Sequence, residues 1–153
     1  MTLDPTTRES NVKDSVKKFF IDNIYKTGYA LVTFDKSLSS PKVQGQTIVA
    51  KWVSINFGSI DTEDALSMCV LEILCCTRSD AEGYQLSHLR DKVVGYLEES
   101  GRIPLYRSYE DQAWEELGAM MVFIGTESGH LAGPDGTKFK RIPVVLKWGS
   151  KYE

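Results

Sequence analysis

The sequence predicts an α+β fold: one domain in which a mixed or antiparallel sheet with long hairpins packs against an N-terminal helix and a central amphipathic helix. The apolar run Leu66–Thr77 has the composition of a buried strand. A pattern with helical spacing follows it directly, over residues 79–100. A strand that leads into a helix lying back on the sheet is typical of an α+β core. The chain of 153 residues is long enough to bury about 70% of its unfolded surface in one core.

The central helix is predicted from its repeat and from its two ends. Ser79 has Glu82 three residues later, which is the arrangement of a capping box. Gly101 lies where a left-handed C-terminal cap would fall. Between these ends, apolar residues recur at spacings of three and four and line one helix face: Leu86, Leu89, Val93 and Leu97. We therefore expect a helix over residues 79–100.

The N-terminal part predicts a second helix and a strand. Over residues 11–26, apolar side chains follow the helical repeat: Val12, Val16, Phe19, Phe20 and Ile24. Gly28 is expected to end this helix, and residues 29–36 have the β-branched and aromatic content of a strand. Residues 1–10 carry no period and are expected to form an arm, so the domain proper comprises residues 11–153.

The run Gln46–Ile60 is long for a strand and has apolar residues on both faces. Both faces must therefore be covered, either within the domain or by another copy of the protein, and the sequence does not separate these possibilities. We expect this strand to contribute to contacts between subunits. Its candidate interface residues are Ile48, Trp52, Ile55 and Phe57.

The C-terminal half predicts a hairpin with a long exposed loop. Residues 103–109, with Pro104, are expected to form a connecting segment, and residues 117–124 a buried strand. Residues 125–136 hold four glycines and are expected to form a mobile tip before the last strand, 139–148. We expect this tip to become ordered against a neighbouring subunit. Further candidate interface residues on the tip and its flank are Glu127, His130, Leu131 and Lys138.

The composition restricts which binding partners and which cellular compartment are expected for the protein. The net charge of −3 argues against a protein that binds nucleic acid by neutralising phosphates, so no sequence-specific nucleic-acid partner is expected. No apolar run reaches the roughly 18–20 residues that a membrane span requires, and the N-terminus lacks a signal-peptide pattern. The cysteines Cys69, Cys75 and Cys76 all fall in the apolar strand and are expected to be buried in a reducing compartment. We expect a soluble, intracellular protein without a membrane partner.

Residue types that carry catalysis do not come together in the sequence. The segment Gly125–His130 contains a serine and a histidine, but its spacing differs from that of a nucleophile elbow, and its glycines match no phosphate-binding pattern. The second histidine, His88, lies beside the apolar helix face. Carboxylates at 61–64 and 110–116 lack the spacing of a calcium loop. We therefore expect no catalytic, cofactor-binding or metal-ligating residue, and no enzymatic activity.

With its elements in this order, the chain resembles the tail terminator proteins of long-tailed bacteriophages, also called tail-completion or minor tail proteins. The segments that carry the resemblance are Leu71–Thr77, which leads into the helix at 79–100, and Arg141–Trp148 at the end of the chain. The resemblance covers residues 11–149. It implies an α+β virion protein without catalytic residues or cofactors.

The resemblance also implies what the protein does and which partners it has. Tail terminators form a ring, usually of six copies, on the last ring of the tail tube, end tube polymerisation, and present a surface to the head connector. The implied partners are further copies of the chain, the tail tube protein and the head-tail connector protein. The implied location is the tail or neck of a virion assembled in the host cytoplasm.

Two other functions stay open. One is another neck or tail component of the phage, such as a head-tail joining protein. The other is a small intracellular enzyme or ligand-binding domain whose pocket is built from scattered residues. Self-association into a closed ring favours a structural role, whereas a monomer with a bound small molecule favours the last possibility.

Overall fold

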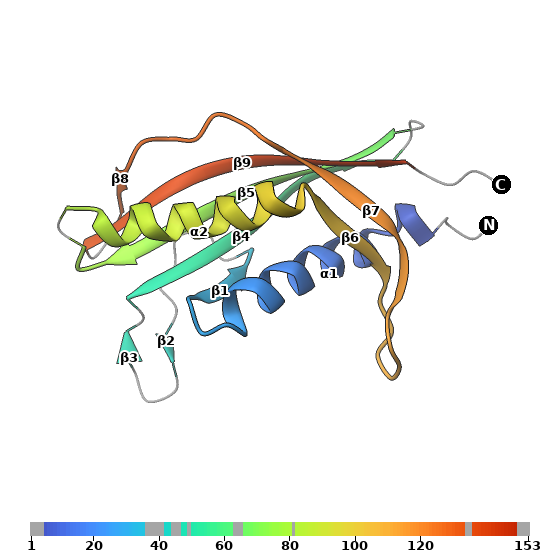
Figure 1. Ribbon diagram of the computed structural model, residues 1–153, viewed down its shortest axis with the longest axis horizontal. Coiled ribbons are helices and arrows are strands. Elements are labelled where there is room, and N and C mark those ends of the chain that lie inside the picture. Colours follow the sequence, from blue (N-terminus) through green and yellow to red (C-terminus); the bar gives the residue numbers. More distant parts are fainter. Residues whose placement is uncertain are drawn as a thin grey trace.

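A curled mixed sheet carries the fold, and both long helices lie on the same face of it (Figure 1). The computed structural model describes residues 5–35, 42–43, 47–48, 50–62, 66–80, 82–133 and 136–149. The elements in chain order are η1 (Pro5–Thr7), α1 (Glu9–Phe20), η2 (Ile21–Tyr25), β1 (Leu31–Phe34), β2 (Lys42–Val43), β3 (Thr47–Ile48), β4 (Lys51–Asp61), β5 (Leu66–Arg78), α2 (Tyr84–Ser100), β6 (Arg102–Arg107), β7 (Glu115–Ile124), β8 (Leu131–Ala132) and β9 (Thr137–Gly149). The predicted α+β class, with an N-terminal and a central helix on a sheet, is confirmed.

Within the described residues, the large sheet has the strand order β1-β4-β5-β9-β7-β6, and β8 also pairs with β9. β1 pairs with β4 in parallel, whereas the other ladders of this sheet are antiparallel, so the sheet is mixed. β5 and β9 form its centre, with pairing that runs from Leu66↔Gly149 to Arg78↔Thr137. β2 and β3 form a separate two-stranded ladder.

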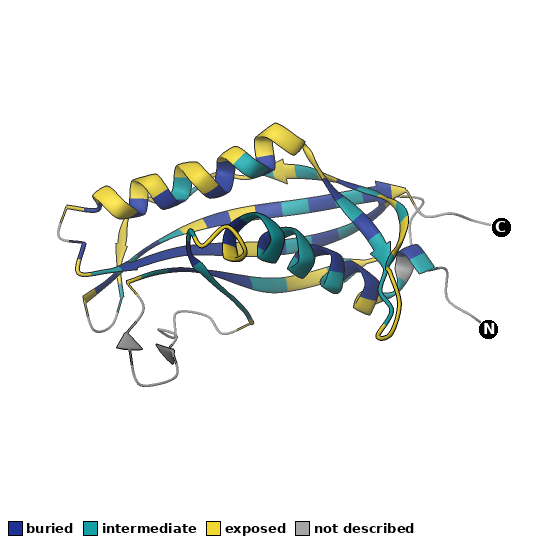
Figure 2. Ribbon diagram, turned by 60° about the horizontal axis from the view of Figure 1, so that its bottom comes forward, coloured by how far each residue is buried: buried dark blue, intermediate teal, exposed yellow. Residues whose placement is uncertain are grey.

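The helices cover one face of the sheet, which we call the inner face. In α1 and the π-helical turn η2, the buried apolar residues recur every four positions and so share one side of the helix: Val12, Val16, Phe20 and Ile24. In α2 they are Leu86, Leu89, Val93, Val94 and Leu97. From β5, alternate residues complete this core: Cys69, Leu71, Ile73 and Cys75. Figure 2 shows the buried rows on the helices and strands, and these rows confirm the helical stripes that the sequence predicts.

The β6 edge of the sheet is closed to further strand pairing. Pro104 has no N–H group to donate to a further strand. The N–H group of Tyr106 is already used, because it donates a hydrogen bond to Ser15 Oγ of α1 at 2.8 Å. Just beyond the strand, Asn11 Oδ1 accepts from the Ser108 N–H at 3.2 Å. These bonds explain why Ser15 and Asn11 are buried in α1. They also leave a partner strand little to pair with at this edge.

Two strand predictions are wrong. The run Gln46–Ile60 is not one strand, because β4 begins at Lys51 and Thr47–Ile48 belongs to the separate ladder. Residues 103–109, predicted as a connecting segment, are largely the edge strand β6. Pro104 does not interrupt this strand, because an edge position does not need the missing donor.

The predicted arm at residues 1–10 is partly structured. Pro5–Thr7 forms a 3₁₀ turn, and α1 begins at Glu9, two residues before the predicted start. The carbonyl oxygen of Thr6 accepts a hydrogen bond from Trp148 Nε1 at 2.8 Å, which ties this turn to the end of β9. At the other helix ends, Gly28 and Gly101 adopt φ angles of 74° and 63°, in agreement with the predicted helix stops.

The start of α2 differs from the predicted capping box. The helix begins at Tyr84, and Ser79 has a φ of 58°, in the left-handed region, instead of the extended geometry of an N-cap. Asp80 takes the capping role. Its Oδ2 accepts from the Leu86 N–H at 2.9 Å, and its Oδ1 accepts from the Gln85 N–H at 3.2 Å. A carboxylate before the helix therefore satisfies the donors that a serine hydroxyl was expected to satisfy.

Replacing Asp80 with alanine is expected to lower the free energy of unfolding by about 1–2 kcal/mol at neutral pH. Burial alone would raise the pKa of Asp80, but hydrogen bonds from the Leu86 and Gln85 N–H groups outweigh it and hold the pKa below its usual value. The stabilisation is therefore present above the usual carboxyl pKa and is lost as the pH falls through the lower folded-state pKa. Urea unfolding of both proteins should show stabilities that converge in acid; equal stability at neutral pH would contradict the capping role.

Candidate interaction surface

The face of the sheet opposite the helices, which we call the outer face, carries exposed apolar side chains. Neighbouring residues of a strand point to opposite faces, so each inner residue of β5, β7 and β9 alternates with an outer one. Three large apolar side chains on the outer face are about half exposed: Leu66 at 47%, Met121 at 43% and Phe123 at 48%. An exposed apolar group of this kind is typical of a surface that binds another macromolecule.

The strand register places these side chains next to one another. Met68 of β5 lies opposite Lys147 of β9, which in turn lies opposite Met121 of β7. In the next outer row, the three neighbouring residues are all apolar: Val70, Val145 and Phe123. Directly opposed residues of an antiparallel ladder have Cβ atoms about 4.5–5.5 Å apart, so the rows form a continuous surface. We call this surface the outer patch, and define it as Leu66, Met68, Val70, Met121, Phe123, Pro143 and Val145.

Cationic side chains lie at the outer patch on β9 and β6, and one of them, Lys147, lies between Met68 and Met121. Lys147 Nζ lies 5.2 Å from the centroid of the Phe123 ring, a cation–π distance. Arg141 is exposed, and its Nε lies 3.8 Å from a carboxylate oxygen of Glu72 on β5. Arg102 of β6 is exposed and lies directly opposite Met121. We call Arg102, Arg141 and Lys147 the basic margin of the patch.

Two of the four candidate interface residues from the run Gln46–Ile60 are wrong, because they are buried within the chain. Trp52 and Ile55 are both 0% exposed. Ile55 belongs to the main core under the helices, whereas Trp52 packs on the other face of the sheet with Leu74, Cys76 and Phe139. Both faces of this part of β4 are therefore covered within the chain. Phe57 is half-buried against the main core, with Lys13 Nζ 5.2 Å from its ring centroid. The side chain of Ile48 lies outside the described part of the structure.

The predicted hairpin tip is not found at residues 125–133. This segment runs along β9 and donates backbone hydrogen bonds to it: Gly125 N–H to Pro143 O at 2.8 Å, Ser128 N–H to Arg141 O at 3.0 Å, and Gly133 N–H to Thr137 O at 2.8 Å. Within it, β8 pairs with β9, placing Leu131 opposite Phe139 and Ala132 opposite Lys138. The segment is therefore a strap held on β9. Residues 134–135 lie outside the described residues.

Three of the candidate interface residues lie on this strap and the fourth, Lys138, lies on β9; they differ in how many contacts they make within the chain. Glu127 is held by Arg90 of α2, with Nε–Oε1 and Nη2–Oε2 distances of 2.7 and 2.6 Å, and Lys140 Nζ lies 3.6 Å away. The Arg90 guanidinium holds the pKa of Glu127 below its usual value, although burial opposes this shift. His130 lies against Gly83, where any added Cβ would be 2.5 Å from its Nδ1. Leu131 is partly exposed, and Lys138 is half-buried.

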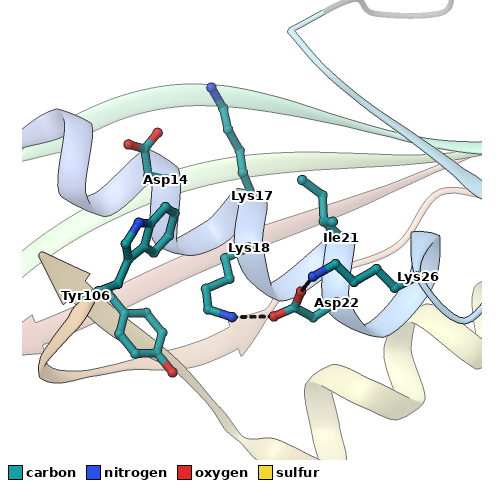
Figure 3. A pocket seen from close by; sticks show the side chains of 8 residues that line it. Asp14, Lys17, Lys18, Ile21, Asp22, Lys26 and Tyr106 are labelled. Carbon is teal, nitrogen blue, oxygen red and sulfur yellow. Dashed lines mark hydrogen bonds and ion pairs between the residues drawn. The ribbon is translucent and has the colours of Figure 1, made fainter. Parts of the chain in front are cut away.

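A hollow of about 620 Å³ lies between α1 and the β6–β7 hairpin (Figure 3). Three of its charged side chains pair with one another: Lys18 Nζ lies 2.5 Å from Asp22 Oδ2, and Lys26 Nζ lies 3.1 Å from Asp22 Oδ1. Asp14 accepts a hydrogen bond from the Ser108 hydroxyl at 2.9 Å. The remaining lining residues are Lys17, Ile21, Tyr106 and Trp114. Asp22 is therefore already bound by two lysines of its own chain, which leaves these three groups less available to a ligand.

The cysteines are buried free thiols, as predicted. Burial raises the pKa of Cys69 to about 11 and that of Cys76 to about 12, and it also raises the pKa of Cys75. Such thiols are poor nucleophiles, because the thiolate is the reactive form. Among the described residues, no group of three His, Cys, Asp or Glu side chains is arranged to hold a metal ion. No helix in that part of the chain has the length and apolar character needed to cross a membrane.

Comparison with known proteins identifies no family and no function for the chain. No protein-family model matches the sequence, and no curated protein matches it significantly. The chain is similar to a solved protein whose name states no function, with a TM-score of 0.46 and 9% sequence identity, over 92% of this chain and 96% of that chain. A likeness of this degree carries no argument about function.

Proposed function

We propose that this chain is a structural virion subunit, a tail terminator that forms a ring and ends polymerisation of the tail tube. The observation that carries the proposal is the outer patch, where Leu66, Met121 and Phe123 are each about half exposed on a sheet face that neither helix covers. A chain that works alone would leave this apolar surface in water. The sequence resemblance to tail terminators supplies the particular assembly.

A ring is one of the assemblies that a repeated contact between identical subunits can form. When a patch on one copy binds a different surface of the next copy, each subunit still offers one free surface, and the series closes into a ring if the rotation permits. The ring must then bind the last ring of tube protein better than a further tube ring does. In this proposal the partners are further copies of the chain, the tail tube protein and the head-tail connector protein.

Negative-stain electron microscopy of the purified protein, alone and after incubation with tail tubes, tests the proposal. We expect rings with a central hole, either free or seated on tube ends. The matched control is tubes without the protein, whose ends should lack the added ring. A protein that remains a dispersed monomer in both samples would contradict the proposal.

The second candidate function is small-molecule binding, and the hollow beside α1 is the observation that favours it. Its volume of about 620 Å³ lies in the usual range of ligand sites. We rank it second because Lys18, Asp22 and Lys26 already bond to one another there. A small molecule that raises the melting temperature of the wild type but not of a Trp114→Ala variant would favour this function.

A further inference from the structure

We propose that neighbouring subunits contact each other head to tail, with the tip of the β6–β7 hairpin of one copy docked on the outer patch and basic margin of the next. This inference rests on the proposed self-assembly and names its two surfaces. The tip is residues 108–116, and its acidic side chains are all exposed: Glu110, Asp111, Glu115 and Glu116. We call it the acidic tip.

The acidic tip has a defined shape before any partner binds. Trp114 Nε1 donates to the carbonyl oxygen of Tyr109 at 3.0 Å, which closes the turn. At its base, the Ser108 hydroxyl donates to Asp14 of α1 at 2.9 Å. A segment held in this way loses little conformational freedom on docking, which favours its use in binding.

The charge of the tip is only partly neutralised by its own chain. Arg107 Nη1 lies 3.8 Å from Glu115, and the Tyr109 hydroxyl donates to the same carboxylate at 3.2 Å. Glu110 and Asp111 make no ion pair with any residue in the described part of the chain. These two carboxylates are therefore available to cations of another molecule.

The acidic tip and the outer patch lie at different ends of β7: the tip includes its first residues, Glu115 and Glu116, whereas Met121 and Phe123 lie near its other end. The tip is bonded to α1 through Ser108, and α1 covers the inner face; Figure 1 shows the hairpin reaching past this helix. Because the tip is held on α1 and is separated from Met121 and Phe123 by the length of β7, it does not reach the outer patch of its own chain, so a contact between the two surfaces joins two copies. Such a contact is heterologous and leaves both copies with a free surface for the next.

Charge favours this contact over one patch packed on a second patch. Arg102, Arg141 and Lys147 lie at the patch. Among the described residues of this face, the carboxylates are Glu72, which faces Arg141, and Asp61 at the far end of the Met68 row. Two patches face to face would bring two basic margins together, which is unfavourable. An acidic tip against the same margin is complementary. Addition of a strand at β6 is a poorer alternative, because Pro104 and Ser15 close that edge.

Charge reversal tests the inference. The tip variant is Glu110→Lys with Asp111→Lys, and the patch variant is Arg141→Glu with Lys147→Glu. The matched control is Glu82→Lys with Asp91→Lys, two exposed carboxylates just before and within α2 that belong to neither surface. Sedimentation velocity and negative-stain microscopy, with tail tubes added if the free wild type is monomeric, would follow ring formation. All variants should keep the wild-type circular dichroism spectrum.

We expect the tip variant and the patch variant each to associate about tenfold to a hundredfold more weakly than the wild type, and the control to associate normally. An equimolar mixture of the two variants should form rings again, because each reversed surface then meets its opposite charge. A tip variant that assembles like the wild type would overturn the inference and leave the proposed ring standing. A wild type that forms no ring, alone or on tubes, would overturn both.

Discussion

Under the proposed function, a phage from which the gene for this chain is deleted is expected to make heads and tail tubes that stay separate, with tubes of abnormal length and with loss of infectivity. A protein that caps a polymer must bind the last ring in preference to a further subunit, so its removal releases length control. Electron microscopy of the lysate measures tube length and head attachment directly.

Complementation is the control for the deletion, and infectivity is the result that can contradict the prediction. Wild-type protein supplied in trans should restore joined particles with tails of one length. Infectious particles of normal tail length without this chain would refute the terminator role. Heads and tubes that stay separate, but with tubes of normal length, would instead favour a head-tail joining protein.

The second large effect is expected from Phe123→Lys, which should abolish ring formation while the subunit stays folded. Phe123 is 48% exposed at the centre of the outer patch, and Lys147 Nζ lies 5.2 Å from the centroid of its ring. A lysine at position 123 would therefore place an ammonium group among apolar side chains and close to a second positive charge. Removing a central aromatic and adding a charge should weaken association by about a hundredfold or more. Sedimentation velocity measures this loss.

A matched control distinguishes an effect on the subunit interface from an effect on folding. Tyr84 on α2 is 66% exposed and lies outside the outer patch, so Tyr84→Lys adds the same charge at another exposed aromatic position. We expect this variant to assemble like the wild type. Both variants should unfold within about 0.5 kcal/mol of the wild type, because neither side chain lies in the core. Normal rings from Phe123→Lys would contradict the role of the patch.

The helices could be predicted from the sequence because their signals are local. The stripe in α2 and the glycine stop at Gly101 depend on spacing within a few residues. The start of α2 could not be predicted in this way. Asp80 reaches the N–H groups of Gln85 and Leu86 across a turn, and the capping-box rule looks only three residues ahead.

The interaction surface was harder to predict because exposure depends on contacts distant in sequence. Met121 and Phe123 lie in an apolar run that is typical of a buried strand, and they are exposed because both helices cover the other face. In contrast, Trp52 looks like an interface anchor and is buried against Leu74 and Phe139. No local pattern distinguishes these two outcomes, since the register of three strands decides them.

The strap at residues 125–133 shows the same difficulty. Glycines at 125, 129 and 133 predict a flexible loop, yet Gly125 and Gly133 both donate backbone hydrogen bonds to β9. Glu127 is held by Arg90, which is 37 residues away in the sequence. The composition of the loop indicates neither contact, and a glycine-rich segment of this kind predicts a mobile tip.

A reconstruction of the virion neck by electron cryomicroscopy, at a resolution that places side chains, tests the central claim most directly. We expect this chain to form a closed ring at the end of the tail tube, with Phe123 and Met121 of each subunit buried against the next. A chain that occupies one non-repeating position outside any ring, or a ring whose outer patch faces solvent, would contradict the claim.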